Sequence, residues 1–272
     1  MVSEESTQKR PKLDTLKAGR LAQLALELTS SLIETFGPRV AGTRESRESA
    51  AVIEEHLKKY CTTTEYQEFT LHSRASTLWL KMMVAVYPVV LAFLWFGLPL
   101  LGTLSYSLFC FYVFREYLAF KPLGEKYTPS SKGANCHGSI EPEKEVLHTV
   151  LFSGHHDSAR LYRYNKLDRA SYYKKVLFPF FLFALLGFSS VVQLITEIVS
   201  MRLFIVNLPP LGNFILNVLL TLCIPLLFPL RDFVLEEGSP GAGDNLISSS
   251  MAVQLARFFD WKKKCGQPLQ HT

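Results

Sequence analysis

Leucines and other apolar residues recur at helical spacing through the first part of the chain. Between residues 13 and 35 they stand every three to five positions, which predicts an amphipathic helix, and they are Leu13, Leu16, Leu21, Leu24, Leu28 and Leu32. A loop rich in glycine and proline follows at 37–43. Thr43 can cap a second helix, whose apolar face holds Ala50, Ile53, Leu57 and Tyr60. The alternating, threonine-rich stretch at 62–72 predicts a strand.

The middle of the chain contains a long run without charge. No charged residue occurs from Met82 to Phe114. One helix of that length would be about 50 Å long, well beyond the ~30 Å hydrocarbon core of a bilayer. Two transmembrane helices at 77–96 and 99–119 fit better, because glycines and a proline near 97–102 supply a turn. The alternative is a buried core segment of a soluble protein.

Two further apolar runs, Val176–Thr196 and Leu211–Leu230, predict a second hairpin with a break around 207–213. Gln193 and Asn217 lie within these runs. They can hydrogen-bond between helices, although a lone polar residue in such a span can also simply be tolerated.

The polar segments between the hairpins have mixed helix and strand character. ANCHGSIEP and EVLHTVLFSG, on either side of a charged turn at 141–145, are strand-like, and a glycine-rich loop leads into a helix at 246–259. Each hairpin returns the chain to the side it left, so the polar segments can fold together. We therefore expect one α/β domain made of 1–76, 120–175 and 231–272, interrupted by transmembrane hairpins at 77–119 and 176–230.

Composition agrees with a membrane protein. Of 272 residues, 48% are hydrophobic, and the mean hydropathy is +0.15. The five cysteines are scattered without a Cys-x-x-Cys pair, which argues against a disulfide framework and a cysteine-rich zinc site. The polar N-terminus has no signal-peptide core, and Val2 excludes myristoylation.

Charge predicts the orientation. Basic residues flank the predicted spans on one side and are Arg115, Lys121, Lys126, Arg160, Arg163, Lys166, Arg169, Lys174, Lys175 and Arg231, whereas the opposite loops hold only Arg202. Since basic loops remain cytoplasmic, the soluble domain and both termini of a multi-pass membrane protein are expected in the cytoplasm. The cations can also contact anionic headgroups of the lipid bilayer. No motif for binding nucleic acid is present.

Candidate chemistry lies in two short motifs. In TVLFSGHHDS at 149–158, an extended chain places His155 and Asp157 on one side and His156 on the other. A carboxylate such as Asp157 can hold the second ring nitrogen of a histidine metal ligand. Asp244, in the loop PGAGDN, could bridge two cations. Each motif alone is weak, since His155 could be an ordinary loop histidine and GDN is a common turn.

Taken together and in order, these segments resemble metallopeptidase family twenty-eight, the dinuclear-zinc exopeptidases. FGPRVAGTRESRESAAVIEEHLKKY resembles the opening loop and helix of that family, EYQEFTL its next strand, TVLFSGHHDS its His-x-Asp strand, and PGAGDNLISSSMAVQLARFF its aspartate loop and helix. The resemblance implies a zinc-exopeptidase-like mixed sheet with flanking helices, two zinc ions and a peptide substrate.

The resemblance also implies roles for three residues. His155 would be a zinc ligand, Asp157 the catalytic-site residue that orients it, and Asp244 the ligand that bridges the two metals. Gly243 stands where the family often has another aspartate, and the membrane hairpins depart from its usual soluble pattern. The family's Glu-Glu pair, later aspartate and final histidine lie further along the chain in that family, and no Glu-Glu follows Asp244 here. The chain is therefore expected to be an N-terminal portion or a truncated product, inactive by itself.

Three functions remain open at this point. The first is a membrane-anchored zinc-dependent exopeptidase of the aminopeptidase type, incomplete in this chain. The second is a non-catalytic, peptidase-like scaffold or binding protein. The third is a small multi-pass membrane protein without a site.

Overall fold

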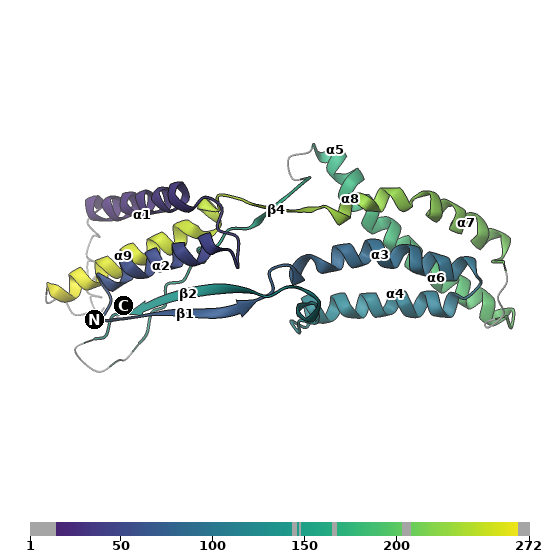
Figure 1. The fold of residues 1–272 in the computed structure, drawn as a ribbon, viewed down its shortest axis with the longest axis horizontal. Helices are drawn as coiled ribbons and strands as arrows, with labels where there is room; N and C mark the ends of the chain where they lie inside the picture. Colours follow the sequence, from purple (N-terminus) through teal and green to yellow (C-terminus); the bar gives the residue numbers. More distant parts are fainter. Residues whose placement is uncertain (1–14, 143–145, 147, 165–167, 203–207, 266–272) are drawn as a thin grey trace, which may run out of the picture. The chain divides into compact units, whose positions relative to one another are not determined.

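The computed structural model of the 272-residue chain describes residues 15–142, 146, 148–164, 168–202 and 208–265. The chain separates into two compact units (Figure 1). Unit 1 consists of Met1–Thr70, Lys132–Ala159 and Gly238–Thr272, and unit 2 of Leu71–Ser131 and Arg160–Glu237. The observed divisions follow residues 70, 131, 159 and 237, whereas the sequence predicts divisions after 76, 119, 175 and 230.

Unit 1 is built on three helices, α1 (Thr15–Phe36), α2 (Arg44–Lys58) and α9 (Ile247–Lys264). Of the predicted leucine stripe, Leu28 and Leu32 are buried and Leu21 and Leu24 are partly buried on α1, while Leu13 and the side chain of Leu16 lie outside what the structure describes. A small core joins the helices and consists of Leu28, Leu32, Ile53, Leu57, Leu246 and Val253. The predicted helices in this unit are therefore confirmed.

Local sequence signals fix the start of α2 and the hairpin beside it. The Thr43 side chain accepts a hydrogen bond from the Ser46 backbone amide at 3.3 Å, which caps α2 as predicted. Strand β1 (Thr63–Leu71) pairs with β2 (Ser131–Ser139), and the start of β1 meets the end of β2, so the pair is antiparallel. β1 lies where the sequence predicts a strand, and β2 overlaps the predicted strand at 134–142 but begins and ends earlier in the chain.

The predicted strand at 145–154 is wrong for the residues that are described. Residues 148–154 have no regular secondary structure, and Val150 and Leu151 are 72% and 85% exposed. A strand requires a neighbour that accepts and donates its backbone hydrogen bonds. The described part of the chain offers none to this segment, so its β-branched and apolar residues do not suffice to form one.

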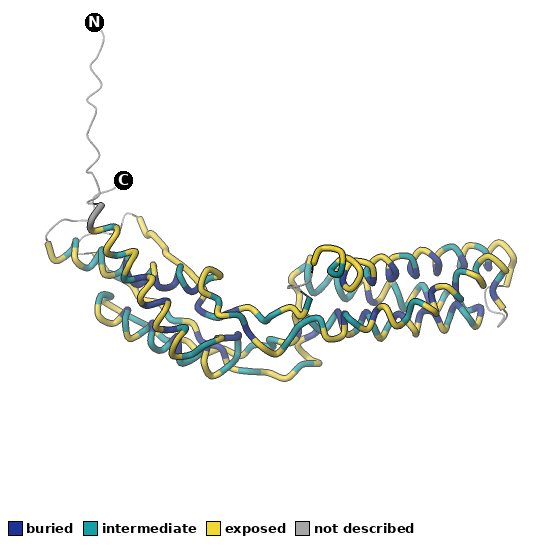
Figure 2. Tube along the Cα trace, turned by 90° about the horizontal axis from the view of Figure 1, so that it is seen from above, coloured by how far each residue is buried: buried dark blue, intermediate teal, exposed yellow. Residues whose placement is uncertain are grey.

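Unit 2 consists mainly of long apolar helices. They are α3 (Ala75–Trp95), α4 (Pro99–Val113) with its π-helical continuation η1 (Phe114–Leu118), α6 (Phe178–Val199) and α7 (Leu211–Leu222), and the four-residue helix α8 (Phe228–Arg231) lies after α7 in the chain. Shorter helices are η2 (Gly124–Tyr127), α5 (Arg169–Tyr172), η3 (Tyr173–Leu177) and η4 (Ile224–Leu227), and a short antiparallel pair joins β3 (Arg160–Tyr162) to β4 (Val234–Gly238). Buried positions recur along each long helix (Figure 2).

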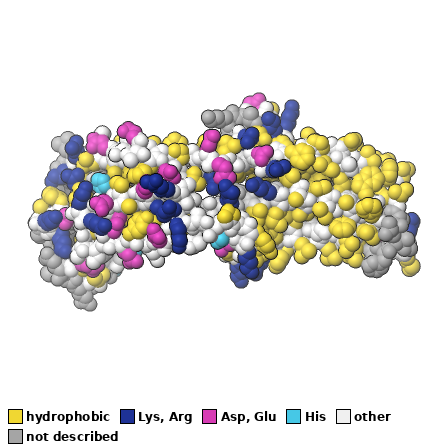
Figure 3. Space-filling model, viewed as in Figure 1, with side chains coloured by type: hydrophobic (Ala, Val, Ile, Leu, Met, Phe, Trp, Pro, Cys, Tyr) yellow, Lys and Arg dark blue, Asp and Glu magenta, His cyan; other side chains and the backbone are white. Residues whose placement is uncertain are grey.

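Two helical segments of unit 2 are long and apolar enough to cross a membrane. They are Ala75–Trp95 and Arg169–Val199, and a third candidate is the pair Leu211–Leu222 and Ile224–Arg231, which is bent by 49° at a break. The fourth predicted run is therefore not one straight helix. Pro225 follows the break and cannot donate a helical hydrogen bond, which accounts for the interruption. Apolar side chains gather on the face of these helices that Figure 3 shows, and many of them are exposed, which is compatible with a surface that faces lipid.

A polar contact crosses the interior of unit 2. The Asn217 amide nitrogen donates to Gln193 Oε1 at 3.4 Å, and Gln193 Nε2 donates to the Leu94 carbonyl at 2.9 Å. Gln193 and Asn217 are both 0% exposed. The predicted hydrogen bond between the two apolar runs is therefore confirmed, and it lies in the interior of unit 2.

Candidate functional site

The segment Gly154–Ser158 presents its side chains alternately to two sides, as an extended chain does. His156 is 9% exposed and points inward, while the side chains of His155 and Asp157 are 50% and 34% exposed. Gly154 permits close contact with the start of α9, since a Cβ atom there would lie 2.6 Å from the Ser249 backbone nitrogen. The motif is therefore held by its backbone, with His155 and Asp157 on the accessible side.

Asp244 reaches the same place from the loop before α9. Gly241 adopts a left-handed conformation with φ of 62°, which turns the chain sharply after Pro240. Asp244 lies within the short segment η5 (Ala242–Leu246) but has non-helical backbone angles, with φ of −127° and ψ of 86°. Its carboxylate is thereby directed to His155, although the second hairpin separates the two in sequence.

The His155 ring lies between two carboxylates. Its Nδ1 atom is 3.2 Å from Asp157 Oδ1, and its Nε2 atom is 3.2 Å from Asp244 Oδ1. Nδ1 is also 3.2 Å from the Asp157 backbone oxygen. The fold thus brings together all three residues that the sequence singles out, and it assigns one ring nitrogen to each aspartate.

His155 Nε2 and Asp244 Oδ1 are spaced as two ligands of one zinc ion would be, but a complete zinc site requires further ligands. Two ligands of a tetrahedral zinc ion, each bound at about 2.0–2.1 Å, lie about 3.3 Å apart. The separation of 3.2 Å between His155 Nε2 and Asp244 Oδ1 matches that spacing, and Asp157 is placed to orient the ring. A zinc site needs at least three protein ligands. No group of three or more His, Cys, Asp or Glu side chains suited to a metal occurs among the described residues.

Gly243 is compatible with the aspartate that the resemblance leads one to expect there. A Cβ atom at Gly243 would meet no heavy atom within 4 Å. A side chain at this position would therefore be accommodated without rearrangement.

A buried arginine holds the two loops of the site together. Arg39 is 0% exposed, and its Nε atom donates to the His156 carbonyl at 3.0 Å. One terminal nitrogen donates to the Gly37 carbonyl at 2.6 Å, and the other to the Pro240 carbonyl at 2.8 Å. The guanidinium group thus connects the loop before α2, the His-x-Asp segment and the loop that leads to Asp244.

Backbone contacts reinforce this connection. The Arg39 amide donates to Ser158 Oγ at 2.9 Å, and the Ser158 amide donates to the Arg39 carbonyl at 2.9 Å. Val40 and Ser158 form a parallel bridge. Burial lowers the pKa of Arg39, and the nearby Asp157 carboxylate opposes that shift. The arginine is therefore tied to the site through its charge as well as through hydrogen bonds.

His156 has a structural position behind the site. Its Nε2 atom lies 3.5 Å from Ser46 Oγ on α2. Burial lowers the pKa of His156, and this effect outweighs the opposing influence of the Asp157 carboxylate and of the hydrogen bond to Ser46. A neutral imidazole in this position packs against α2 without placing a further charge behind His155.

Sequence reasoning identifies His155, Asp157 and Asp244 but not Arg39. An arginine in a glycine- and proline-rich loop is normally solvated, and nothing in its local sequence distinguishes it. The available signal is the position of Arg39 in the opening loop that resembles the peptidase family.

Comparison with protein-family models, with curated proteins and with solved structures finds no match to this chain.

Replacing Arg39 with methionine is expected to loosen unit 1 by about 3–5 kcal/mol, because buried carbonyl groups lose a charged hydrogen-bond donor. Hydrogen exchange measures this locally. Amides at 37–46, 154–159 and 238–246 should exchange faster in R39M, while Arg20→Met, a matched change at an exposed arginine of α1, should leave them unchanged. Equal protection in R39M and the parent chain would contradict the assigned role of Arg39.

The zinc interpretation predicts weak binding of zinc by residues 1–272 through His155 and Asp244. Isothermal titration should show this binding lost in His155→Ala and Asp244→Ala. The matched control is His137→Ala, because His137 Nε2 also lies 3.2 Å from a carboxylate, that of Glu65, but its ring does not lie between two aspartates. Equal loss of binding in all three variants would indicate nonspecific coordination at the surface.

Proposed function

We propose that this chain is part of a membrane-anchored, zinc-dependent exopeptidase. The observation that carries the proposal is the His155 ring, held between Asp157 and Asp244 at 3.2 Å on each side. The sequence resemblance assigns these same residues to a ligand, its orienting carboxylate and a bridging ligand. Agreement between an assignment made from sequence order and a spatial arrangement supports the proposal.

Each residue has a distinct task in this proposal. His155 Nε2 and Asp244 Oδ1 would hold zinc, and Asp157 accepts the Nδ1 proton of His155 and fixes the tautomer in which Nε2 is free to bind. A pair of zinc ions supplies an activated water and polarises the scissile carbonyl. Asp244 is 84% exposed, which leaves its second oxygen open for another ligand or cation.

Further ligands and the general base are not assigned to residues of this chain. No glutamate follows Asp244 within the 272 residues, so the Glu-Glu pair implied by the resemblance is not supplied there. The two proposed ligands alone do not complete one zinc site, still less two. We therefore expect residues 1–272 by themselves to be inactive toward peptides.

Membrane anchoring is proposed through four helices, α3, α4, α6 and the broken pair α7 and α8. α4 has 15 residues and continues through η1, which together approach the length of about 20 residues needed to span a bilayer. The hairpin arrangement and the basic flanks favour a cytoplasmic location for unit 1.

A second candidate is a non-catalytic, peptidase-like scaffold. The observation that favours it is that both ring nitrogens of His155 already face a carboxylate. A protonated His155 can donate to Asp157 and Asp244 at once, and this satisfies the ring without metal. Activity measurements separate the two candidates.

Peptide hydrolysis tests the leading proposal. A longer product of the same gene that carries the Glu-Glu pair, the later aspartate and the final histidine is expected to hydrolyse a peptide library in a chelator-sensitive way. His155→Ala and Asp244→Ala should abolish this activity, whereas Asp157→Asn should reduce it about 10–100-fold, the usual cost of losing an orienting partner. The control His137→Ala should retain activity.

Two outcomes would overturn parts of this account. Turnover by residues 1–272 alone would show that the general base and missing ligands have been misassigned. A longer product that binds zinc at His155 but hydrolyses no peptide would establish the scaffold alternative.

The proposed topology predicts which cysteines an impermeant maleimide can reach. Cys265 is exposed, while burial raises the pKa of the Cys61 and Cys136 thiols, that of Cys136 to about 11, and so reduces their reactivity. In a variant that retains only Cys265, labelling should require permeabilised cells. With Ser200→Cys as the sole cysteine, in the opposite loop, intact cells should be labelled. The reverse pattern would contradict the cytoplasmic assignment.

A further inference from the structure

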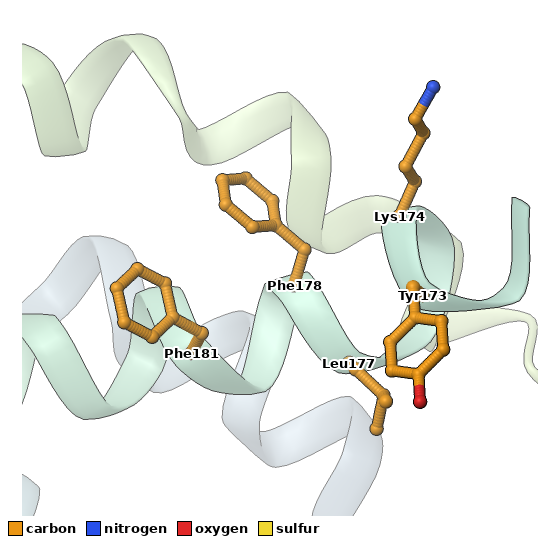
Figure 4. Close-up of a pocket in the computed structure, with 5 residues that line it drawn as sticks. All are labelled: Tyr173, Lys174, Leu177, Phe178 and Phe181. Atoms are coloured by element: carbon orange, nitrogen blue, oxygen red, sulfur yellow. The ribbon is translucent and has the colours of Figure 1, made fainter. Parts of the chain in front are cut away.

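An apolar groove lies at the start of the longest helical segment of unit 2. It has a volume of 330 Å³ and is lined by Tyr173, Lys174, Leu177, Phe178 and Phe181 (Figure 4). The first three belong to the π-helical turn η3 and the last two to α6. Phe178 and Phe181 are 41% and 59% exposed, so the groove is open on the surface.

Two rows of long side chains form the walls. Lys174, Phe178 and Phe181 extend to one side of the helix, and Tyr173 and Leu177 to the other (Figure 4). Lys174 and Phe178 are four residues apart, as are Tyr173 and Leu177, and such pairs lie one above the other on a helix, so both rows follow the helix axis. Phe181 extends the apolar lining further along the same axis, as a linear apolar chain would require.

The beginning of the groove is positively charged. The Lys174 side chain lines it, and the Arg169 guanidinium lies 5.8 Å from the centre of the Tyr173 ring. Lys175 is close by, with its ammonium group 5.3 Å from the centre of the Tyr164 ring. The Asp168 carboxylate interacts electrostatically with Lys174. It also accepts a hydrogen bond from the Ser171 amide at 2.6 Å. Cations therefore exceed anions at this end.

The position along the helix matches a membrane interface. Arg169–Val199 is 31 residues long, more than the roughly 20 that cross a bilayer core, and its basic residues stand at the beginning. A lipid headgroup at that level would meet Lys174 and Arg169, and its acyl chain would extend along Leu177, Phe178 and Phe181. Basic side chains followed by an apolar surface complement an anionic phospholipid.

We propose that this groove binds one anionic phospholipid, with the phosphate at Lys174 and Arg169 and an acyl chain between the two rows of side chains. The proposal assumes that the helices of unit 2 are embedded in a bilayer, but it does not depend on peptidase activity. A soluble phosphate would use the cations without filling the apolar groove, and a neutral lipid would fill the groove without using the cations.

Lipid retention in nanodiscs tests this assignment. The 272-residue chain is reconstituted with equal parts of phosphatidylglycerol and phosphatidylcholine, extracted gently, and its bound lipids are counted by native mass spectrometry. The parent chain should retain phosphatidylglycerol preferentially. Lys174→Gln should lower that preference about fivefold, the factor that corresponds to ~1 kcal/mol for one basic residue at an anionic surface.

Matched variants separate the groove from general attraction to an anionic membrane. Arg202→Gln removes one charge beyond the opposite end of the same helical segment and should leave the preference unchanged, and Lys174→Arg should retain it. Phe178→Ala combined with Phe181→Ala should reduce the retention of both lipids, because it removes the apolar walls. Soluble glycerol phosphate should not displace the bound lipid.

Three results would overturn the proposal. They are an unchanged lipid preference in Lys174→Gln, an equal loss in Arg202→Gln, and displacement of the lipid by glycerol phosphate. The first two would reduce the observation to membrane charge in general. The third would indicate a site for a soluble phosphate.

Discussion

The buried guanidinium group of Arg39 is the interaction on which the candidate site depends. It donates to the carbonyls of Gly37, His156 and Pro240, which belong to segments far apart in sequence. The contact between His155 and Asp244 cannot perform this task, because an ion pair with side chains 50% and 84% exposed contributes only about 0–1 kcal/mol. Proximity of the proposed ligands is therefore a consequence of the backbone that Arg39 holds, and the ligands themselves add little to it.

Unit 2 follows a different rule, since its helices leave large apolar side chains on the outside and polar ones inside. Leu108 and Phe188 are 67% and 65% exposed, whereas Gln193 and Asn217 are fully buried and hydrogen-bonded to each other. Glu197, one turn further along α6, is 1% exposed, and its carboxylate has no hydrogen-bond partner among the described residues. This inside-out distribution is what a hydrocarbon solvent favours, because lipid cannot satisfy polar groups.

The sequence predicts those parts of the structure that result from interactions between residues close together in the chain. The helices at 15–36 and 44–58, the hairpin turn near Gly97 and the cap at Thr43 follow from spacing and short-range hydrogen bonds, and the sequence predicts them. The failure at 148–154 concerns a strand, whose existence depends on a partner that local composition cannot specify. Arg39 is not identified for a related reason, since two of the three carbonyls that hold it, those of His156 and Pro240, come from distant segments. The three site residues were found because their order along the chain, and not their local environment, carries the information.

The two candidate functions require the same state of His155 Nδ1 but different states of His155 Nε2. In both, Nδ1 donates a proton to Asp157, so the geometry of that contact serves a metal ligand and a simple ion pair equally well. At Nε2 the alternatives exclude each other, because a zinc ligand must present a lone pair there while an ion pair with Asp244 requires a proton. Metal and proton thus compete for one atom. The exposure of Asp244 is compatible with both functions. Its carboxylate can accept a hydrogen bond from a protonated Nε2, or it can bind the same metal ion as His155. The function of the site therefore depends on whether His155 Nε2, which lies 3.2 Å from Asp244 Oδ1, binds a metal or carries a proton.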